Sequence, residues 1–201
     1  MTRTPRADKR QAILAGALSV FARDGYTRAS IDTISAAAGV STRTIYNHFT
    51  DKAQLFQTVI QESAAAAAHA QIAIIDRHLS KVTDLEADLV EFGRAFVAPA
   101  ADQAAHFALV RQINAEAGHI PAAAIEAWQE TGPRRVRREL AGRLERLAGQ
   151  GLLEIGDPDR AALHLMALIS ATGRAVAVPT EEEIAETVRA GVRVFLHGYL
   201  R

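Results

Sequence analysis

The chain has 201 residues, which is enough for one large domain or two small ones with a buried core. Its apolar fraction of 49% excludes a disordered protein, and the absence of cysteine excludes disulfides and thiolate metal sites. Lysine and arginine (23) balance aspartate and glutamate (23), so the total charge does not by itself favour a nucleic-acid partner.

The charges are distributed unevenly along the chain. Residues 1–52 hold 8 Lys/Arg against 4 Asp/Glu, and residues 53–201 hold 15 against 19. A basic N-terminal quarter on an acidic body suits a protein that approaches a polyanion with one end. The longest apolar stretch, residues 161–178, contains His164 and Arg174 and predicts a buried helix rather than a membrane span. No apolar signal-type segment follows the basic N-terminus, so we expect a cytoplasmic protein with no membrane partner.

The apolar periodicity predicts an all-α fold of about nine helices with no strand. The first helix is expected over residues 8–24 and ends at Gly25. Ser30 and Ser41 are expected to be N-caps of two short helices, and Thr50 of a long fourth helix of roughly 40 Å.

Helical patterns continue through the rest of the chain, over residues 85–98, 102–116, 122–130 and 133–149. Asp157-Pro158 starts a further helix. Thr180 with Glu183 forms a capping box that starts the last one.

Residues 31–49 form the most informative motif, two short helices joined by a tight turn at Gly39. Its apolar positions are expected in the core: Ile34, Ala38, Val40, Ile45 and Phe49. The other face of the second helix carries side chains that can hydrogen-bond to bases and phosphates: Thr42, Arg43, Thr44, Tyr46, Asn47 and His48. This is the build of a helix-turn-helix, whose second helix enters the DNA major groove.

A longer pattern surrounds this motif. It comprises Gly25-Tyr26, Ala29-Ser30-Ile31, Ile34, Ala38-Gly39-Val40-Ser41, Thr44-Ile45-Tyr46, His48-Phe49, Lys52 and Leu55. Over about residues 8–56 the chain thereby resembles the TetR family of bacterial one-component transcriptional regulators. The resemblance implies a homodimer that binds a palindromic operator in double-stranded DNA. The resemblance also implies that this homodimer acts, as is usual in the family, as a repressor and is released by a small ligand held in the C-terminal bundle.

The chain is therefore expected to divide into a helix-turn-helix DNA-binding domain and a larger helical bundle. We place the first at residues 1–52 and the second, for ligand binding and dimerisation, at residues 53–201. No glycine- or serine-rich linker separates them, so the fourth helix belongs to both.

The expected DNA contacts follow from position and chemistry. Arg43 is the candidate for a bidentate contact to guanine, and Ser30 lies at a helix N-terminus that can hold a phosphate. Tyr46, His48 and Lys52 resemble the family's phosphate contacts. The full set is Ser30, Ser41, Thr42, Arg43, Thr44, Tyr46, Asn47, His48 and Lys52, and the tail residues Arg3, Arg6, Lys9 and Arg10 could add backbone contacts. The alternatives are that Tyr46 only packs and that Arg43 and His48 are only solvated.

The last two helices carry dense apolar stripes. We expect these helices to pair with their symmetry mates in a four-helix dimer interface that includes Leu163, Ile169, Val188, Val192, Phe195 and Tyr199. The alternative is that the stripes form the core of a single chain.

A small-molecule effector is expected in the C-terminal bundle. The candidate walls are Phe92, Phe96, Phe107, Ile113, Trp128 and Met166, which favour a mainly apolar ligand, and ordinary core packing is the alternative. No cofactor or metal is expected. Residues 107–159 resemble the C-terminal half of AefR-like members of the family.

Three further hypotheses can be set against these expectations. The arginines at 134, 135, 137, 138, 143 and 146 could form a second nucleic-acid patch or a solvated helix face paired with Glu139 and Glu145. An enzyme is not expected, because no sequence pattern joins a nucleophile to a base. The remaining alternative is a helical protein-interaction or structural protein without DNA binding.

Overall fold

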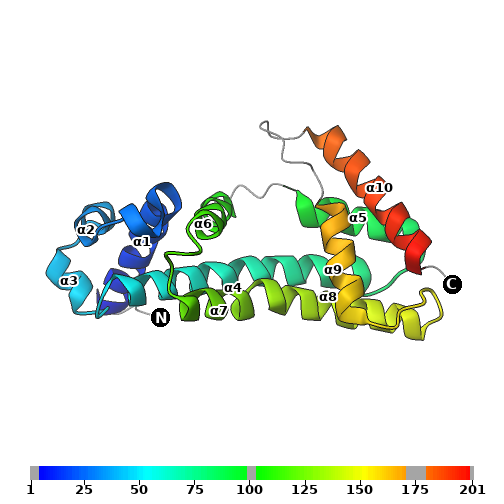
Figure 1. Cartoon of the computed structure of the whole chain (residues 1–201), viewed down its shortest axis with the longest axis horizontal. Coiled ribbons are helices and arrows are strands. Elements are labelled where there is room, and N and C mark those ends of the chain that lie inside the picture. Colours follow the sequence, from blue (N-terminus) through cyan, green and yellow to red (C-terminus); the bar gives the residue numbers. More distant parts are fainter. Residues whose placement is uncertain (1–4, 99–102, 171–179, 200–201) are drawn as a thin grey trace. The chain divides into compact units, whose positions relative to one another are not determined.

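The structure is a computed structural model that describes residues 5–98, 103–170 and 180–199. Every regular element within these ranges is an α-helix, which confirms the all-α prediction (Figure 1). The described ranges hold ten helices: α1 (Pro5–Arg28), α2 (Ile31–Ala38), α3 (Thr42–Tyr46), α4 (Lys52–Leu79), α5 (Leu85–Val97), α6 (Ala104–Ala115), α7 (Ala122–Thr131), α8 (Pro133–Gly149), α9 (Pro158–Ile169) and α10 (Glu181–Tyr199).

The helices pack into two compact units. Unit 1 comprises Met1–Ala67 and Ala100–Pro133, and unit 2 comprises Ala68–Pro99 and Arg134–Arg201. Helices α6 and α7 therefore belong with α1–α3 and the first part of α4. The boundary between the two compact units therefore does not fall at residue 52. The boundary expected at residue 52 separates two functions, DNA binding from ligand binding and dimerisation, and does not concern packing.

Side-chain caps start the short helices of unit 1. Ser30 Oγ accepts a hydrogen bond from Thr33 N–H at 3.1 Å, and Ser41 Oγ accepts one from Thr44 N–H at 3.1 Å. Both N-cap predictions are confirmed, because each hydroxyl satisfies a backbone donor that has no partner within its helix.

The cap of α4 differs from the expectation. Asp51 Oδ1 accepts from Gln54 N–H at 2.8 Å, whereas Thr50 uses its own N–H to donate to Gln54 Oε1 at 2.7 Å. Asp51 therefore caps the helix in place of Thr50. A carboxylate at this position also interacts favourably with the positive end of the helix dipole.

The last two helices begin as the sequence predicts. Glu183 and Thr180 form the reciprocal capping box, with Thr180 N–H to Glu183 Oε2 at 2.7 Å and Glu183 N–H to Thr180 Oγ1 at 3.2 Å. Asp157 accepts from Arg160 N–H at 3.0 Å at the start of α9. This backbone hydrogen bond is the main cause that lowers the pKa of Asp157.

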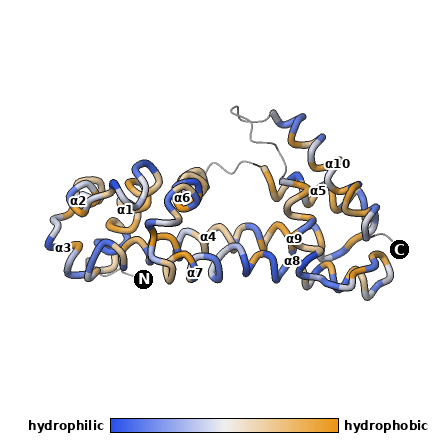
Figure 2. Tube along the Cα trace, viewed as in Figure 1, coloured by the Kyte–Doolittle hydropathy of each residue, from blue (hydrophilic) through white to orange (hydrophobic). Residues whose placement is uncertain are grey.

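Unit 1 has a core built from α1, the helix-turn-helix, α4, α6 and α7. Ile13, Phe21 and Phe56 are buried there, and the Phe21 and Phe56 rings meet edge to face at a centroid distance of 4.9 Å. Figure 2 shows hydrophobic and hydrophilic residues interleaved along the helices, as expected where one face of each is buried.

Close packing of α1 on α2 depends on a glycine. A Cβ atom added at Gly16 would lie 2.8 Å from Ala38 N and 2.9 Å from Ala38 Cβ. Only a residue without a side chain permits this approach, so Gly16 determines how closely α2 lies to α1.

Unit 2 has its own core, in which α10 packs on α5 and α9. Four residues of the expected dimer stripe lie in this core, at 0–1% exposure: Ile169, Val188, Val192 and Phe195. A side chain already buried within one chain has no surface to give to a partner, so these four are core residues and not dimer contacts. Leu163, in contrast, is 50% exposed.

Two arginines of α8 pair with carboxylates of other helices. Arg137 Nε lies 2.9 Å from Asp159 Oδ1, and Arg143 pairs with Asp76. The expected partners were glutamates on the same helix, and for these two arginines the observed partners come from other helices. These contacts favour a structural role over a second nucleic-acid patch.

Candidate nucleic-acid interface

Helix α3 presents polar residues because two apolar ones anchor it. Ile45 is fully buried and Phe49 is 5% exposed in the core of unit 1. The helix has five residues and ends at Tyr46. Hydrogen bonds from Asn47 N–H to Arg43 O at 3.1 Å and from Phe49 N–H to Ile45 O at 2.9 Å continue the turn to Phe49.

The remaining face of this segment is open to solvent. Arg43, Tyr46 and Asn47 are exposed, and Thr42, Thr44 and His48 are half-buried. Tyr46 is 56% exposed, which argues against a purely packing role. The structure therefore separates the segment into a packing set and an exposed polar set, as the helix-turn-helix interpretation requires.

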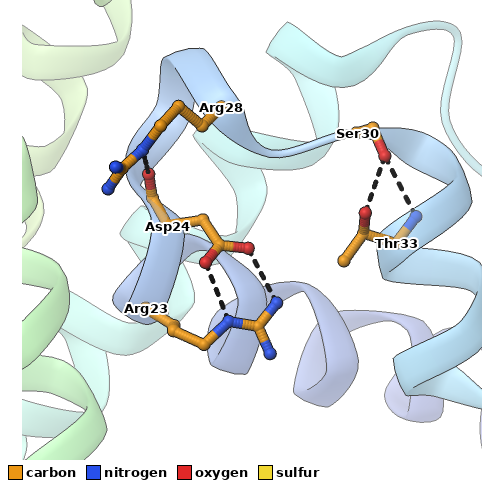
Figure 3. A network of polar contacts seen from close by, with 5 residues as sticks. All are labelled: Arg23, Asp24, Arg28, Ser30 and Thr33. Carbon is orange, nitrogen blue, oxygen red and sulfur yellow. Dashed lines mark hydrogen bonds and ion pairs between the residues drawn. The ribbon is translucent and has the colours of Figure 1, made fainter.

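The serines at the helix starts form matching hydroxyl pairs. Ser30 Oγ lies 2.8 Å from Thr33 Oγ1, and Ser41 Oγ lies 2.9 Å from Thr44 Oγ1. Figure 3 shows that the Ser30 hydroxyl points back to the first turn of α2. These hydroxyls are oriented by capping, and their lone pairs are already in part used within the protein.

Lys52 has a different environment from the one that the sequence suggests. Its Nζ donates to Tyr26 O at 2.9 Å and Ala29 O at 3.1 Å, lies 3.5 Å from Thr27 O, and stands 4.6 Å from the centroid of the Tyr26 ring. An ammonium has three donors, and these carbonyls account for them. A phosphate contact by Lys52 would have to replace one of these bonds.

Acidic charge near the end of α1 is neutralised. The Asp24 carboxylate accepts a bidentate pair of hydrogen bonds from Arg23, with Nε to Oδ1 at 2.8 Å and Nη2 to Oδ2 at 2.7 Å (Figure 3). Arg28 Nε donates to the backbone carbonyl of Asp24 at 3.0 Å. The hydrogen bond from Arg23 is the main cause that lowers the pKa of Asp24. Sequence reasoning missed the exposed Arg28, which adds a cation to this part of unit 1.

The basic N-terminal residues are only in part available for DNA. Arg10 Nη2 lies 3.0 Å from Glu62 Oε1, and its guanidinium lies 5.8 Å from the centroid of the Phe49 ring. Lys9 is exposed. Arg3 and the side chain of Arg6 lie outside the described residues.

The expected effector residues are divided between the two units. Phe92, Phe96 and Met166 lie in or against the core of unit 2, where the rings of Phe92 and Phe96 are 5.3 Å apart. Ile113 and Trp128 are buried in unit 1, and Phe107 is 40% exposed. The six residues thus do not form one cluster within either unit.

One half-buried histidine in unit 1 contacts a neighbouring helix. His106 Nδ1 on α6 lies 2.9 Å from Ser63 Oγ on α4. Burial lowers the pKa of His106, because desolvation disfavours the charged imidazolium.

An apolar groove lies along α10 in unit 2. It has a volume of about 450 Å³ and is lined by Leu168, Ala190, Gly191 and Val194 together with Glu183, Glu186 and Thr187. Val194 is 58% exposed. Gly191 allows α9 and α10 to approach closely, because a Cβ there would lie 2.7 Å from Leu168 C.

The Tyr199 hydroxyl lies 2.8 Å from His164 Nδ1.

Two features are absent from the part of the chain that the structure describes. Among the described residues, no helix is both long and apolar enough to cross a membrane. In the same ranges, His, Asp and Glu side chains form no group of three or more that could hold a metal ion.

Comparisons with known proteins agree with this geometry. Residues 13–59 match the model of the bacterial regulatory proteins of the tetR family, and residues 87–201 match the C-terminal domain of AefR-like transcriptional repressors. The fold and the exposed face of α3 thus define a helix-turn-helix regulator of transcription. More particularly, the chain belongs to the TetR family, with a C-terminal domain of the AefR-like type.

Solved structures show the same fold over the whole chain. A TetR-family transcriptional regulator from Mesorhizobium loti MAFF303099 is 28% identical at a TM-score of 0.83, with 99% of this chain and 100% of that chain covered. The flavonoid-responsive regulator FrrA is 30% identical at a TM-score of 0.66, with 96% and 97% covered.

A curated relative matches over a short segment. The transcriptional activator FasR of Mycolicibacterium smegmatis is 41% identical over 59 residues, which are 29% of this chain and 27% of the relative. The chain therefore matches only about a quarter of the length of this relative. The comparisons indicate a regulator of transcription.

Proposed function

We propose that the chain is a repressor that binds a palindromic DNA operator as a homodimer and is released by a small, mainly apolar effector. The exposed polar face of α3, held by the buried Ile45 and Phe49, carries this proposal. Within it, Arg43 contacts base edges. Tyr46, together with Asn47 and His48 in the turn that follows α3, contacts phosphates and determines the register of the helix on the duplex. A regulator that binds bacterial DNA works in the cytoplasm.

The repressor assignment is supported by the AefR-like match, whose description is of transcriptional repressors. FasR is an activator, so the sign of regulation is a separate question from DNA binding. Transcription from a reporter that carries the selected operator answers it, because a repressor lowers expression when it is bound.

The homodimer is proposed through the groove on α10, with the exposed Val194 at its surface. A palindromic operator requires a two-fold axis, which places two α3 helices in half-sites about one helical turn apart. Two copies of the apolar groove would cover each other, and apolar surface would be removed from water.

The effector is proposed to contact the aromatic pair Phe92 and Phe96 together with Met166 in unit 2, since these three residues lie in one unit. FrrA, which is similar over nearly the whole chain, is flavonoid-responsive by name. A planar, mainly apolar molecule is therefore the first class of effector to test.

Selection of bound fragments from a random double-stranded DNA pool tests the function. The expected result is enrichment of an inverted repeat, and loss of the bound complex when a flavonoid such as quercetin or another apolar compound of a panel is added. A pool that remains unenriched would instead support a helical interaction protein without DNA binding.

A further inference from the structure

The link between α1 and α2 is unusual in how its backbone groups are held. We call residues 25–29 the α1–α2 junction. The helical path of α1 is broken at Gly25, which has φ of 80° and ψ of −179°, and α2 begins at Ile31. A positive φ of this size favours glycine, so the break is encoded in the sequence.

A carboxylate from α6 contacts this junction. Glu116, the residue directly after α6, accepts hydrogen bonds at Oε2 from Thr27 N–H at 2.9 Å and from Thr27 Oγ1 at 3.2 Å. The absence of a side chain at Gly25 leaves room for this carboxylate, because a Cβ there would overlap Glu116 Oε1. Gly25 thus allows the break in the helix and also leaves space for the Glu116 carboxylate.

An ammonium from α4 contacts the same junction. Lys52 donates to Tyr26 O and Ala29 O, so the carbonyls of the junction face a cation while the amide of Thr27 faces an anion. Charge-assisted hydrogen bonds are stronger than neutral ones. The junction is therefore held by α4 and α6 through groups of opposite charge.

We propose that Glu116 is a positioning residue for DNA binding, which with Lys52 fixes the junction and hence the orientation of α2 and α3. This proposal rests on the proposed function. Helices α2 and α3 follow the junction directly, so a freed junction allows both to rotate about the end of α1. A recognition helix has to be held to within about 0.5 Å, and such a rotation weakens its contacts.

Electrostatics alone predicts the opposite change in DNA affinity when Glu116 is removed, so the experiment distinguishes the two explanations. Removing a carboxylate from a DNA-binding module lowers repulsion from phosphate, so simple charge removal leaves binding unchanged or makes it tighter. Glu62 is a matched control, because it is also a half-exposed carboxylate of unit 1 with an ion-pair partner, Arg10. The variants Glu116→Ala and Glu62→Ala remove the same charge.

The experiment measures the affinity of the full-length variants for the fragments that the wild-type chain selects. We expect Glu116→Ala to bind about tenfold more weakly, as for loss of a hydrogen bond to a charged group. Glu62→Ala is expected to bind at least as tightly as wild type. Glu116→Gln should stay within about threefold of wild type, because its amide oxygen can still accept from Thr27 N–H.

Amide exchange of Thr27 in the free protein gives a readout that does not involve DNA. Exchange should accelerate in Glu116→Ala, and remain near the wild-type rate in Glu116→Gln and Glu62→Ala. Unchanged or tighter DNA binding by Glu116→Ala would overturn the proposal, as would equal losses in the alanine and glutamine variants. If the wild-type chain selects no DNA, the proposed function fails and the positioning role fails with it. Thr27 exchange still shows whether Glu116 holds the junction.

Discussion

Replacement of Gly16 by alanine tests whether α1 and α2 are packed as closely as the structure shows. The new Cβ would lie 2.8 Å from Ala38 N and 2.9 Å from Ala38 Cα, closer than such atoms can approach. Both neighbours are backbone atoms of α2, so a side-chain rotation cannot relieve the overlap. One of the two helices has to move.

The magnitude follows from a comparison with Gly142 in α8, where an added Cβ would meet nothing within 4 Å. Alanine gains about 1 kcal/mol of helix propensity over glycine at both positions. At both positions alanine also lowers the conformational entropy of the unfolded chain by a similar amount. The difference between the two variants therefore isolates overpacking, which costs about 1–3 kcal/mol.

Urea unfolding followed by circular dichroism measures this difference. We expect Gly142→Ala to raise the free energy of unfolding by about 0.5–1 kcal/mol. Gly16→Ala is expected to fall about 1–3 kcal/mol below Gly142→Ala. Equal stabilisation by the two substitutions would refute the close packing of α1 on α2.

Two more predictions address the dimer and the half-buried His106. Val194→Glu places a charge in the α10 groove and should give monomers in sedimentation velocity with unchanged helical content; a persistent dimer would place the interface elsewhere. Because burial lowers the pKa of His106, the unfolded chain binds more protons as pH falls through about 6.5, and the free energy of unfolding falls with it. His106→Gln should lose part of this pH dependence, whereas His119→Gln, at an exposed position, should keep it; the same slope in both variants would exclude His106 as the cause.

Local signals in the sequence were sufficient for most of unit 1. N-caps at Ser30 and Ser41 depend on residues only three positions away, and the apolar spacing of Ile45 and Phe49 determines which face of the helix-turn-helix is buried. Such short-range patterns follow from helix geometry, so they can be found without knowing the rest of the fold.

The apolar stripe of α10 shows why packing partners could not be predicted. The spacing of Val188, Val192 and Phe195 identifies a buried face, but it does not say which surface covers it. Helices α5 and α9 of the same chain cover this face, and the exposed Val194 lies on another. The periodicity of apolar residues therefore predicts which face of a helix is buried, but not which helix covers that face.

Contacts between residues far apart in sequence were also beyond prediction. Glu116 and Thr27 are 89 positions apart, and Lys52 is 26 positions from Tyr26. The resemblance to the family suggests that Lys52 binds phosphate, whereas the carbonyls that accept hydrogen bonds from its ammonium group are not visible in the sequence. Only the fold brings these groups together.

The central claim is that the exposed face of α3 binds DNA, with Arg43 contacting base edges. Selection from one random DNA pool by the wild-type chain, Arg43→Ala and Arg135→Ala tests it, since Arg135 is an exposed arginine of unit 2 and loses the same charge. We predict that wild type and Arg135→Ala enrich the same inverted repeat. Arg43→Ala should lose preference at one position of each half-site, with about 1–3 kcal/mol less discrimination there. An unchanged repeat and affinity for Arg43→Ala would contradict the account.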